Sequence, residues 1–236
     1  MTITETPFST TATDRLVPVS FDVYRDIHKG IRSELFAVVV EAGRLDPADD
    51  LGAVALADQV QRTVQLLLDH AEHEDGPILA SLEVHAPELA ERIVGEHHEI
   101  DARMLQLVDL ANAARDGRDR RFPLHELYLE LAAFTAAYLQ HQDVEERIVA
   151  QALDAAVGFE GLLAIHGATV GAIPPQELVS SLALMLPVMN VDDRTEMLGG
   201  MQATAPAEVF EGVWSLAKSV LTTDEHRAVG TRLGLS

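Results

Sequence analysis

Histidines and carboxylates occur four residues apart at three places in the chain. The pairs are His70 with Glu74, His97 with Asp101, and His141 with Glu145. Residues four apart lie on the same face of an α-helix, so each pair would present two metal-binding side chains in one direction. His28 lies on the apolar face of another predicted helix and offers a single further ligand.

These polar side chains lie on apolar stripes that a helix would turn towards a protein core. Leu127, Leu131, Phe134 and Tyr138 recur at helical spacing, and His141 and then Glu145 continue the same stripe. Burying a carboxylate without a partner costs several kcal/mol. Cations held between carboxylates would remove that cost, so the pattern predicts a metal site inside a helical core.

The number of ligands indicates more than one ion. Together the pairs and His28 supply four imidazoles and three carboxylates, which exceeds the needs of a single cation. Cysteine is absent, which excludes thiolate ligands and cysteine nucleophiles. Imidazole suits iron, zinc, copper and nickel, whereas carboxylate suits harder ions. The mixture favours two iron ions, a non-haem di-iron centre, over manganese or zinc.

The composition predicts an all-α fold. Hydrophobic residues make up 47% of the chain but aromatic residues only 5%, which favours helices over strands. Apolar stripes predict long helices at about 20–41, 51–75, 86–114 and 123–153. Short connections between them predict an antiparallel up-down-up-down four-helix bundle.

The chain divides into three predicted regions. Residues 1–19 are polar and threonine-rich and are expected to form a flexible tail, followed by the bundle at 20–158. Residues 159–236 break into shorter segments separated by Gly and Pro, which predicts additional short C-terminal helices.

Charge limits the classes of partner. The chain has 17 Lys and Arg against 38 Asp and Glu, a net charge of -21, which repels nucleic acid and anionic membrane surfaces. We therefore expect a small-molecule or cation ligand, with a protein partner or homo-oligomer left open. The tail lacks a signal-peptide pattern, and the apolar segment 178–191 is short and interrupted by Pro187. A cytoplasmic location is expected.

Residues 20–155 resemble the hemerythrin-like, or HHE cation-binding, proteins. The resemblance depends on four motifs in order: "DIHKGIR", "HAEHED", "EHHEID" and "HQDVEE". It implies a four-helix bundle around a non-haem di-iron centre that meets dioxygen, nitric oxide or peroxide. It also implies that Glu74 and Glu145 bridge the two irons. The residues implied to bind iron directly are His28, His70, Glu74, His97, His141 and Glu145.

Two departures from the oxygen-carrying members concern the ligand set. Those members have a second histidine four residues after the helix-three histidine, where this chain has Asp101. They have an Asp five residues after the helix-four histidine, where this chain has Glu145 at four. A ligand set with fewer imidazoles has harder donor atoms and donates more electron density to the metal. Ferritin-like proteins need Glu-x-x-His, which this chain does not contain.

Several assignments stay open at the level of sequence. Asp101 is either a ligand or an acid that orients an imidazole, and His98 could replace His97 after a small helix rotation. Tyr24 and Tyr138 are core residues or hydrogen-bond donors to a bound oxygen species. The remaining histidines either have no carboxylate four residues later or lie off the apolar stripes of the predicted helices. They are His73, His85, His125, His166 and His226.

The sequence leads to one principal function and two alternatives. The principal one is a di-iron protein that binds dioxygen, nitric oxide or peroxide and, if it is an enzyme, acts as an oxidoreductase on peroxide or nitric oxide. The first alternative is a non-catalytic iron- or oxygen-responsive sensor that signals through residues 159–236. The second alternative is a metal-free bundle in which the histidines and carboxylates of the apolar stripes form ion pairs and hydrogen bonds with one another.

Overall fold

The computed structural model describes residues 17–235, and every regular element in that range is helical. The predicted all-α class is therefore confirmed. The tail expected over residues 1–19 lies mostly in 1–16, outside the described residues.

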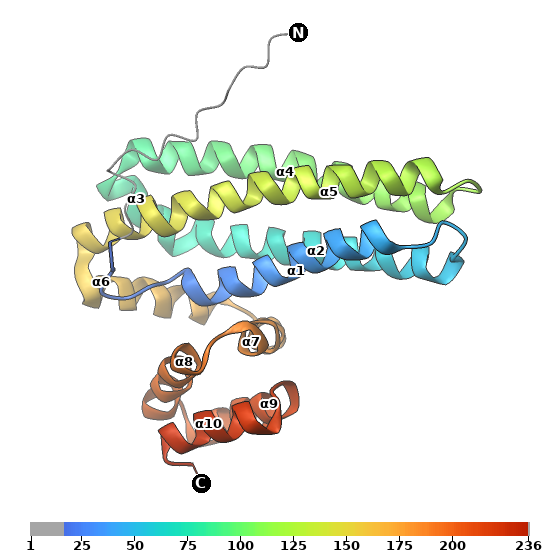
Figure 1. Ribbon diagram of the computed structural model, residues 1–236. Helices are drawn as coiled ribbons and strands as arrows, with labels where there is room; N and C mark the ends of the chain where they lie inside the picture. The colour runs from blue at the N-terminus through green and yellow to red at the C-terminus, as the bar shows by residue number, and fades with distance from the viewer. Residues whose placement is uncertain (1–16, 236) are drawn as a thin grey trace.

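Four long helices lie side by side and form the larger part of the molecule (Figure 1). They are α1 (Arg25–Arg44), α2 (Asp50–His73), α4 (Pro87–Asp116) and α5 (Arg121–Val144). Helix α1 packs against α2 and α5, and α4 packs against the same two helices. Each long helix therefore faces the shared core, which is filled by apolar side chains that include Leu35, Val60, Leu107 and Phe134.

The first helix begins later than its apolar pattern predicts. Ser20, at the predicted start of this helix, instead donates its backbone N–H to the Asp154 carboxylate at 3.0 Å. The Asp22 carboxylate accepts the backbone N–H groups of Tyr24 and Arg25, at 3.0 and 2.9 Å. These donors are among those that a helix start leaves unpaired, so Asp22 sets the beginning of α1.

Two of the long helices end in a π-helical turn. Turn η1 (Glu74–Ile78) joins α2 to α3 (Leu79–His85), and η2 (Glu145–Val149) joins α5 to α6 (Ala150–Ala172). In η1, Gly76 has non-helical angles (φ -84°, ψ -114°), as expected where Gly76 and Pro77 interrupt the pattern. π-Helical turns are rare in proteins, and those that occur are often found at functional sites. Each begins at a glutamate of a predicted metal-binding pair.

Gly158 breaks the regular backbone within α6. The element spans Ala150–Ala172, but Gly158 has non-helical angles (φ 62°, ψ -172°), so two helical segments meet at a kink there, next to the boundary expected between residues 158 and 159. Positive φ is accessible to glycine at little cost, which explains the residue found there. The run Arg121–Ala172 contains a stretch long and apolar enough to cross a membrane by length and composition alone. The run includes α5, which contributes Leu127, Leu131 and Phe134 to the bundle core, whereas the apolar stretch itself is 22% buried.

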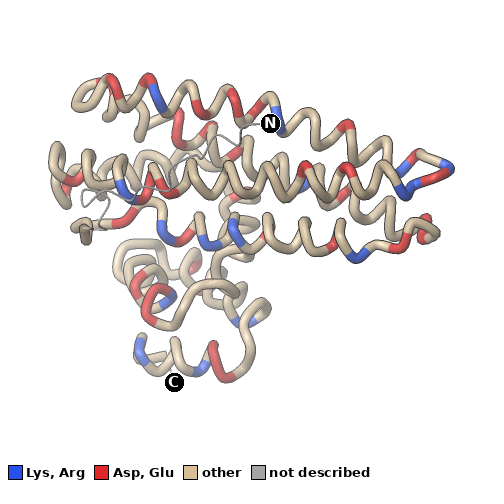
Figure 2. The backbone as a smooth tube through the Cα atoms, turned by 45° about the horizontal axis from the view of Figure 1, so that its top comes forward, with Lys and Arg blue, Asp and Glu red and all other residues tan. Residues whose placement is uncertain are grey.

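The last four helices form a smaller unit below α1 and α6 (Figure 1). They are α7 (Pro175–Val188), α8 (Val191–Thr204), α9 (Ala207–Val220) and α10 (Thr223–Leu233). We call them the C-terminal unit. It has its own apolar core, which includes Leu186, Leu198, Ala217 and Val229, and α7 packs against α1. Acidic residues are spread along the bundle helices and the C-terminal unit (Figure 2).

Candidate metal centre

Six buried side chains converge at one end of the bundle in two overlapping groups. The first group is His28, His70, Glu74 and Glu145, and the second is Glu74, His97, His141 and Glu145. Within each group the ligand atoms all lie within 4.8 Å of one another. The histidines come from α1, α2, α4 and α5, and the glutamates from the first residues of η1 and η2. The π-helical turns thus start at the two side chains that both groups share.

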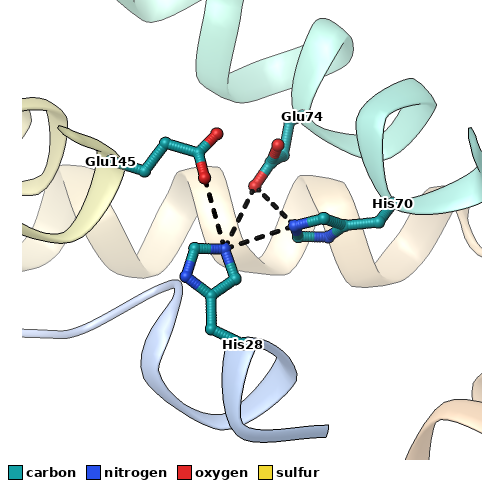
Figure 3. Close-up of side chains that lie close together, drawn as sticks. All are labelled: His28, His70, Glu74 and Glu145. Carbon is teal, nitrogen blue, oxygen red and sulfur yellow. Dashed lines mark hydrogen bonds and ion pairs between the residues drawn. The ribbon is translucent and has the colours of Figure 1, made fainter. Parts of the chain in front are cut away.

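The first group is compact (Figure 3). Nε2 of His28 and Nε2 of His70 lie 3.2 Å apart. Nε2 of His70 is 3.1 Å from Oε1 of Glu74, and Nε2 of His28 is 3.4 Å from Oε2 of Glu145. Two imidazole nitrogens and two carboxylate oxygens therefore point at one small volume.

The second group uses the other oxygen of each glutamate. Nε2 of His141 is 3.1 Å from Oε1 of Glu145, and Nε2 of His97 is 3.6 Å from Oε2 of Glu74. Glu74 thus turns Oε1 to the first group and Oε2 to the second, while Glu145 turns Oε2 to the first and Oε1 to the second. This division is what a carboxylate that bridges two cations requires.

The hydrogen bonding inside the cluster is incomplete without cations. Both carboxylate oxygens of Glu74, Oε2 of Glu145 and Nε2 of His97 are buried and have no hydrogen-bond partner. Nε2 of His97 and Oε2 of Glu74 lie 3.6 Å apart, which is within ion-pair distance but too far for a hydrogen bond. Unsatisfied buried polar groups cost about 1–3 kcal/mol each, and more when charged. Two metal ions would satisfy them, so these residues fit a pair of cations.

Three of the four histidines are held from behind by a carboxylate. Nδ1 of His28 contacts Oε1 of Glu146 at 3.0 Å, and Nδ1 of His97 contacts Oδ1 of Asp75 at 2.9 Å. Nδ1 of His141 contacts Oε2 of Glu96 at 2.9 Å. A carboxylate accepts a hydrogen bond from each Nδ1–H. In the neutral ring this leaves the lone pair on Nε2, directed to the centre of the cluster, and makes the ring a stronger ligand.

The pKa values of the metal-free site show that it needs positive charge. Burial lowers the pKa of His28, but the hydrogen bond to Glu146 and the nearby carboxylates of Glu74 and Glu145 outweigh burial and raise it to about 9. The pKa of His97 also rises to about 9, because Glu145 and the charge of Glu74 outweigh burial. Burial would raise the pKa of Glu74, yet the charge of His70 holds it well below its usual value. Without metal, protons on imidazole take the place of the cations.

The other predicted candidates lie outside both groups. Asp101 is not a member of either, although its Oδ1 is buried and lacks a hydrogen-bond partner. His97 is buried and belongs to the second group, whereas its neighbour His98 is exposed. His73 pairs with Glu177 of the C-terminal unit at 3.1 Å.

Two buried tyrosines flank the cluster. The Tyr24 ring centroid is 5.2 Å from that of His28, and the Tyr138 centroid is 5.9 Å from that of His141. Burial, with smaller contributions from the charges of Glu74 and Glu145, raises both phenol pKa values well above the usual range. Both phenols therefore keep their protons at neutral pH.

The outer carboxylates Asp75, Glu96 and Glu146 were not singled out from the sequence. In the sequence, only their position next to a candidate ligand could have indicated them. Asp75 and Glu146 each follow a shared glutamate, and Glu96 precedes His97.

Comparison with known proteins identifies the family. Neither the curated proteins nor the solved structures include a match to this chain. The hemerythrin HHE cation binding domain matches residues 19–153, more than half of the sequence, and this range contains every residue of both ligand groups. The resemblance predicted from the four motifs is confirmed: the chain belongs to the hemerythrin family of HHE cation-binding domains.

Proposed function

We propose that this protein holds two iron ions in a non-haem centre that binds dioxygen, nitric oxide or peroxide. In this proposal α1, α2, α4 and α5 act as an antiparallel four-helix bundle, and the C-terminal unit is an addition to it. The observation that carries the proposal is the division of the Glu74 and Glu145 oxygens between two groups of ligands. A single ion would leave half of these donor atoms without a function.

The ligand set leaves room for a small molecule. Each position would receive two imidazole nitrogens and one oxygen from each shared glutamate, a set that leaves coordination positions open on iron. Bound iron would supply redox and Lewis-acid chemistry to the small molecule. The protein contributes burial, which excludes water, and two protonated phenols at Tyr24 and Tyr138 that can donate hydrogen bonds.

We extend the proposal to reduction of peroxide or nitric oxide, which would make the protein a di-iron oxidoreductase. Its support is the ligand set of four imidazoles and two carboxylates, which has Asp101, outside both groups, at the position where the oxygen-carrying members have a further histidine. A set with fewer imidazoles donates more electron density to iron. A cytoplasmic location remains part of the proposal, on the basis of composition.

The test combines metal analysis with spectroscopy. Protein expressed with iron is expected to contain two irons per chain and to change its absorption spectrum on exposure to oxygen, nitric oxide or peroxide. His141→Ala should cripple the site, whereas His166→Ala, which changes a histidine of α6 outside both groups, should leave metal content unchanged. One zinc per chain, or equal losses in both variants, would overturn the proposal. Peroxide consumption then decides between binding and turnover.

A sensor is the second candidate, because the C-terminal unit docks beside a ligand. A Cβ atom on Gly30 would lie 2.9 Å from Cγ of Leu184, so α7 approaches α1 closely two residues from His28. Lys29 pairs with Asp193, and His73 pairs with Glu177. The two ligand-bearing helices α1 and α2 therefore both contact the C-terminal unit.

The sensor requires metal to change that contact. A ligand shifts a conformational equilibrium only through different affinities for the two states. Hydrogen exchange over residues 175–233, with and without iron, distinguishes the candidates. Protection that depends on iron, in a protein without turnover, favours the sensor. Protection indifferent to iron, together with peroxide consumption, favours the oxidoreductase.

A further inference from the structure

The two helix pairs that build the centre contribute the same residue types in the same order. Helices α1 and α2 with η1 supply one set, and α4 and α5 with η2 supply the other. The corresponding residues are His28 and His97, His70 and His141, Glu74 and Glu145, and then Asp75 and Glu146. The two metal positions are therefore equivalent in their direct ligands, and any difference between them must come from residues around the ligands.

One of the surrounding contacts repeats in both halves. Glu146 follows Glu145 and contacts Nδ1 of His28 at 3.0 Å. Asp75 follows Glu74 and contacts Nδ1 of His97 at 2.9 Å. In each case the acid from one helix pair supports a histidine of the other pair, so this contact makes the two positions alike.

A second contact occurs in only one half. Glu96, which precedes His97, contacts Nδ1 of His141 at 2.9 Å. The corresponding residue before His28 is Ile27. Within residues 17–235, Nδ1 of His70 has no hydrogen-bond partner among the contacts recorded for that ring. The position of His28 and His70 therefore has one supporting carboxylate, whereas the position of His97 and His141 has two.

The C-terminal unit accounts for the apolar residue at position 27. Ile27 packs against the bundle core and also against the core of the C-terminal unit. A carboxylate there would be placed in an apolar contact and would lose its solvation. Glu96 faces no such neighbour and remains about one-quarter exposed, held by Arg92 at 2.7 Å.

Nearby charges act in the same direction. Arg32, four residues after His28, donates two hydrogen bonds to Glu146 at 2.8 and 3.0 Å. The corresponding residue four after His97 is Asp101, a carboxylate with one buried oxygen that has no hydrogen-bond partner. A cation therefore offsets the acid behind His28, whereas an additional anion lies on the side of His97. Arg92 offsets Glu96 in part, but Asp75 has no recorded cationic side chain within the described residues except His97 itself.

We propose that the two metal positions differ in affinity: the position of His97 and His141 binds its ion first and more tightly, with Glu96 as the positioning residue responsible, and the position of His28 and His70 is the labile one. This inference rests on the two-ion centre proposed above. Loss of a carboxylate behind a ligating histidine typically weakens metal binding about 10- to 100-fold. We therefore expect two dissociation constants separated by at least about tenfold.

The first experiment is a titration of the full-length metal-free protein with Co²⁺, in competition with a chelator. Two steps are expected in the wild-type protein. Glu96→Gln, which keeps the shape of the side chain, should weaken the tighter step about 10- to 100-fold and bring the two steps together. Glu96→Asp should recover part of the loss, and Glu99→Gln, which changes an exposed carboxylate of the same helix, should change neither step.

The second experiment locates the first ion. Crystals grown with one Co²⁺ per chain are expected to show anomalous scattering between His97 and His141. Exchanging the two residues, Ile27→Glu with Glu96→Ile, should move that signal to the side of His28 and His70. Because Ile27 also packs against the C-terminal unit, this variant can lose its fold; the Glu96→Gln titration then decides alone.

The possible results separate this inference from the proposed function. Two steps of equal affinity, a first ion beside His28, or a tight step unchanged in Glu96→Gln would overturn the inference and leave the two-metal centre intact. A single ion per chain at all Co²⁺ concentrations would overturn both.

Discussion

The bundle and the C-terminal unit are both helical and both enclose an apolar core, but they treat buried charge differently. In the C-terminal unit, buried Arg194 donates to the carbonyl oxygens of Leu186 and Pro187, at 2.7 and 3.1 Å, and to Glu225 at 3.0 Å. In the bundle, buried Glu74 has no hydrogen-bond partner at either oxygen. The first charge is held by hydrogen bonds to a carboxylate and two carbonyl groups, whereas the second lies near imidazoles without accepting a hydrogen bond.

This difference distinguishes a buried charge that stabilises the fold from buried charges that are available to bind a ligand. Arg194 joins the end of α7 to α10, so its cost of burial is offset by bonds that hold the unit together. The one unpaired buried side-chain atom recorded in the C-terminal unit is Nε2 of His226, whose ring stacks on Trp214 at 4.0 Å. In the bundle, the unpaired buried atoms of Glu74, Glu145 and His97 belong to the two ligand groups and lie close to one another, which is a property of a site that receives a cation.

The largest effect is expected from removing a shared glutamate. Glu145→Ala deletes a ligand from both groups, so we expect metal content to fall from two ions to fewer than one per chain. Elemental analysis after iron loading measures this, and circular dichroism checks that the variant remains helical. Retention of two ions by a folded variant would show that Glu145 does not bridge.

A second effect is a pH dependence confined to the metal-free bundle. The folded-state pKa of His28 is about 9, above its usual 6.5, so its proton stabilises the metal-free fold. That stabilisation is fully present below pH 6.5 and is lost as the pH rises through 9, with a size of roughly 3 kcal/mol for this residue. Metal requires the neutral imidazole, so the iron-loaded protein should not show the same loss.

The measurement is urea unfolding of the metal-free and iron-loaded protein at pH 6.5 and 9. The difference in unfolding free energy between the two forms is expected to widen at the higher pH. A metal-free protein whose stability rises over this range would contradict the assignment of protonated imidazoles in the cluster.

Arg194→Met should affect the fold of the C-terminal unit but not the metal centre. The substitution removes three hydrogen bonds and leaves two carbonyl groups without donors, which we expect to cost about 2–3 kcal/mol. Chemical denaturation monitored by the fluorescence of Trp214 reports on this unit. Metal content should stay at two ions per chain; a parallel loss of metal would mean that the two regions do not behave independently.

The sequence was sufficient to place the six histidines and glutamates of the two groups on the inner faces of their helices, because periodicity specifies which face a side chain occupies. It did not specify the outer carboxylates. Glu146 and Asp75 lie one residue beyond a ligand on their own helices, and each reaches a histidine of another helix, α1 or α4. Such contacts depend on the π-helical turns and on how the helices are placed against one another, which local pattern does not encode.

The smallest effect concerns the contact between the two regions. Gly30→Ala would place a Cβ atom 2.9 Å from Cγ of Leu184, and relief of that contact requires the Leu184 side chain to change rotamer or α7 to move away from α1, at a cost of about 1–2 kcal/mol. Gly95→Ala is the matched control, because nothing lies within 4 Å of its Cβ position in α4. In a helix interior that control should stabilise the protein by up to about 1 kcal/mol. In thermal unfolding, the melting temperature is expected to fall in Gly30→Ala and to rise in Gly95→Ala. Hydrogen exchange in α7 should rise only in Gly30→Ala. If both variants are equally stable, α7 does not depend on a close approach at Gly30, and the route from the C-terminal unit to His28 that the sensor candidate needs is lost.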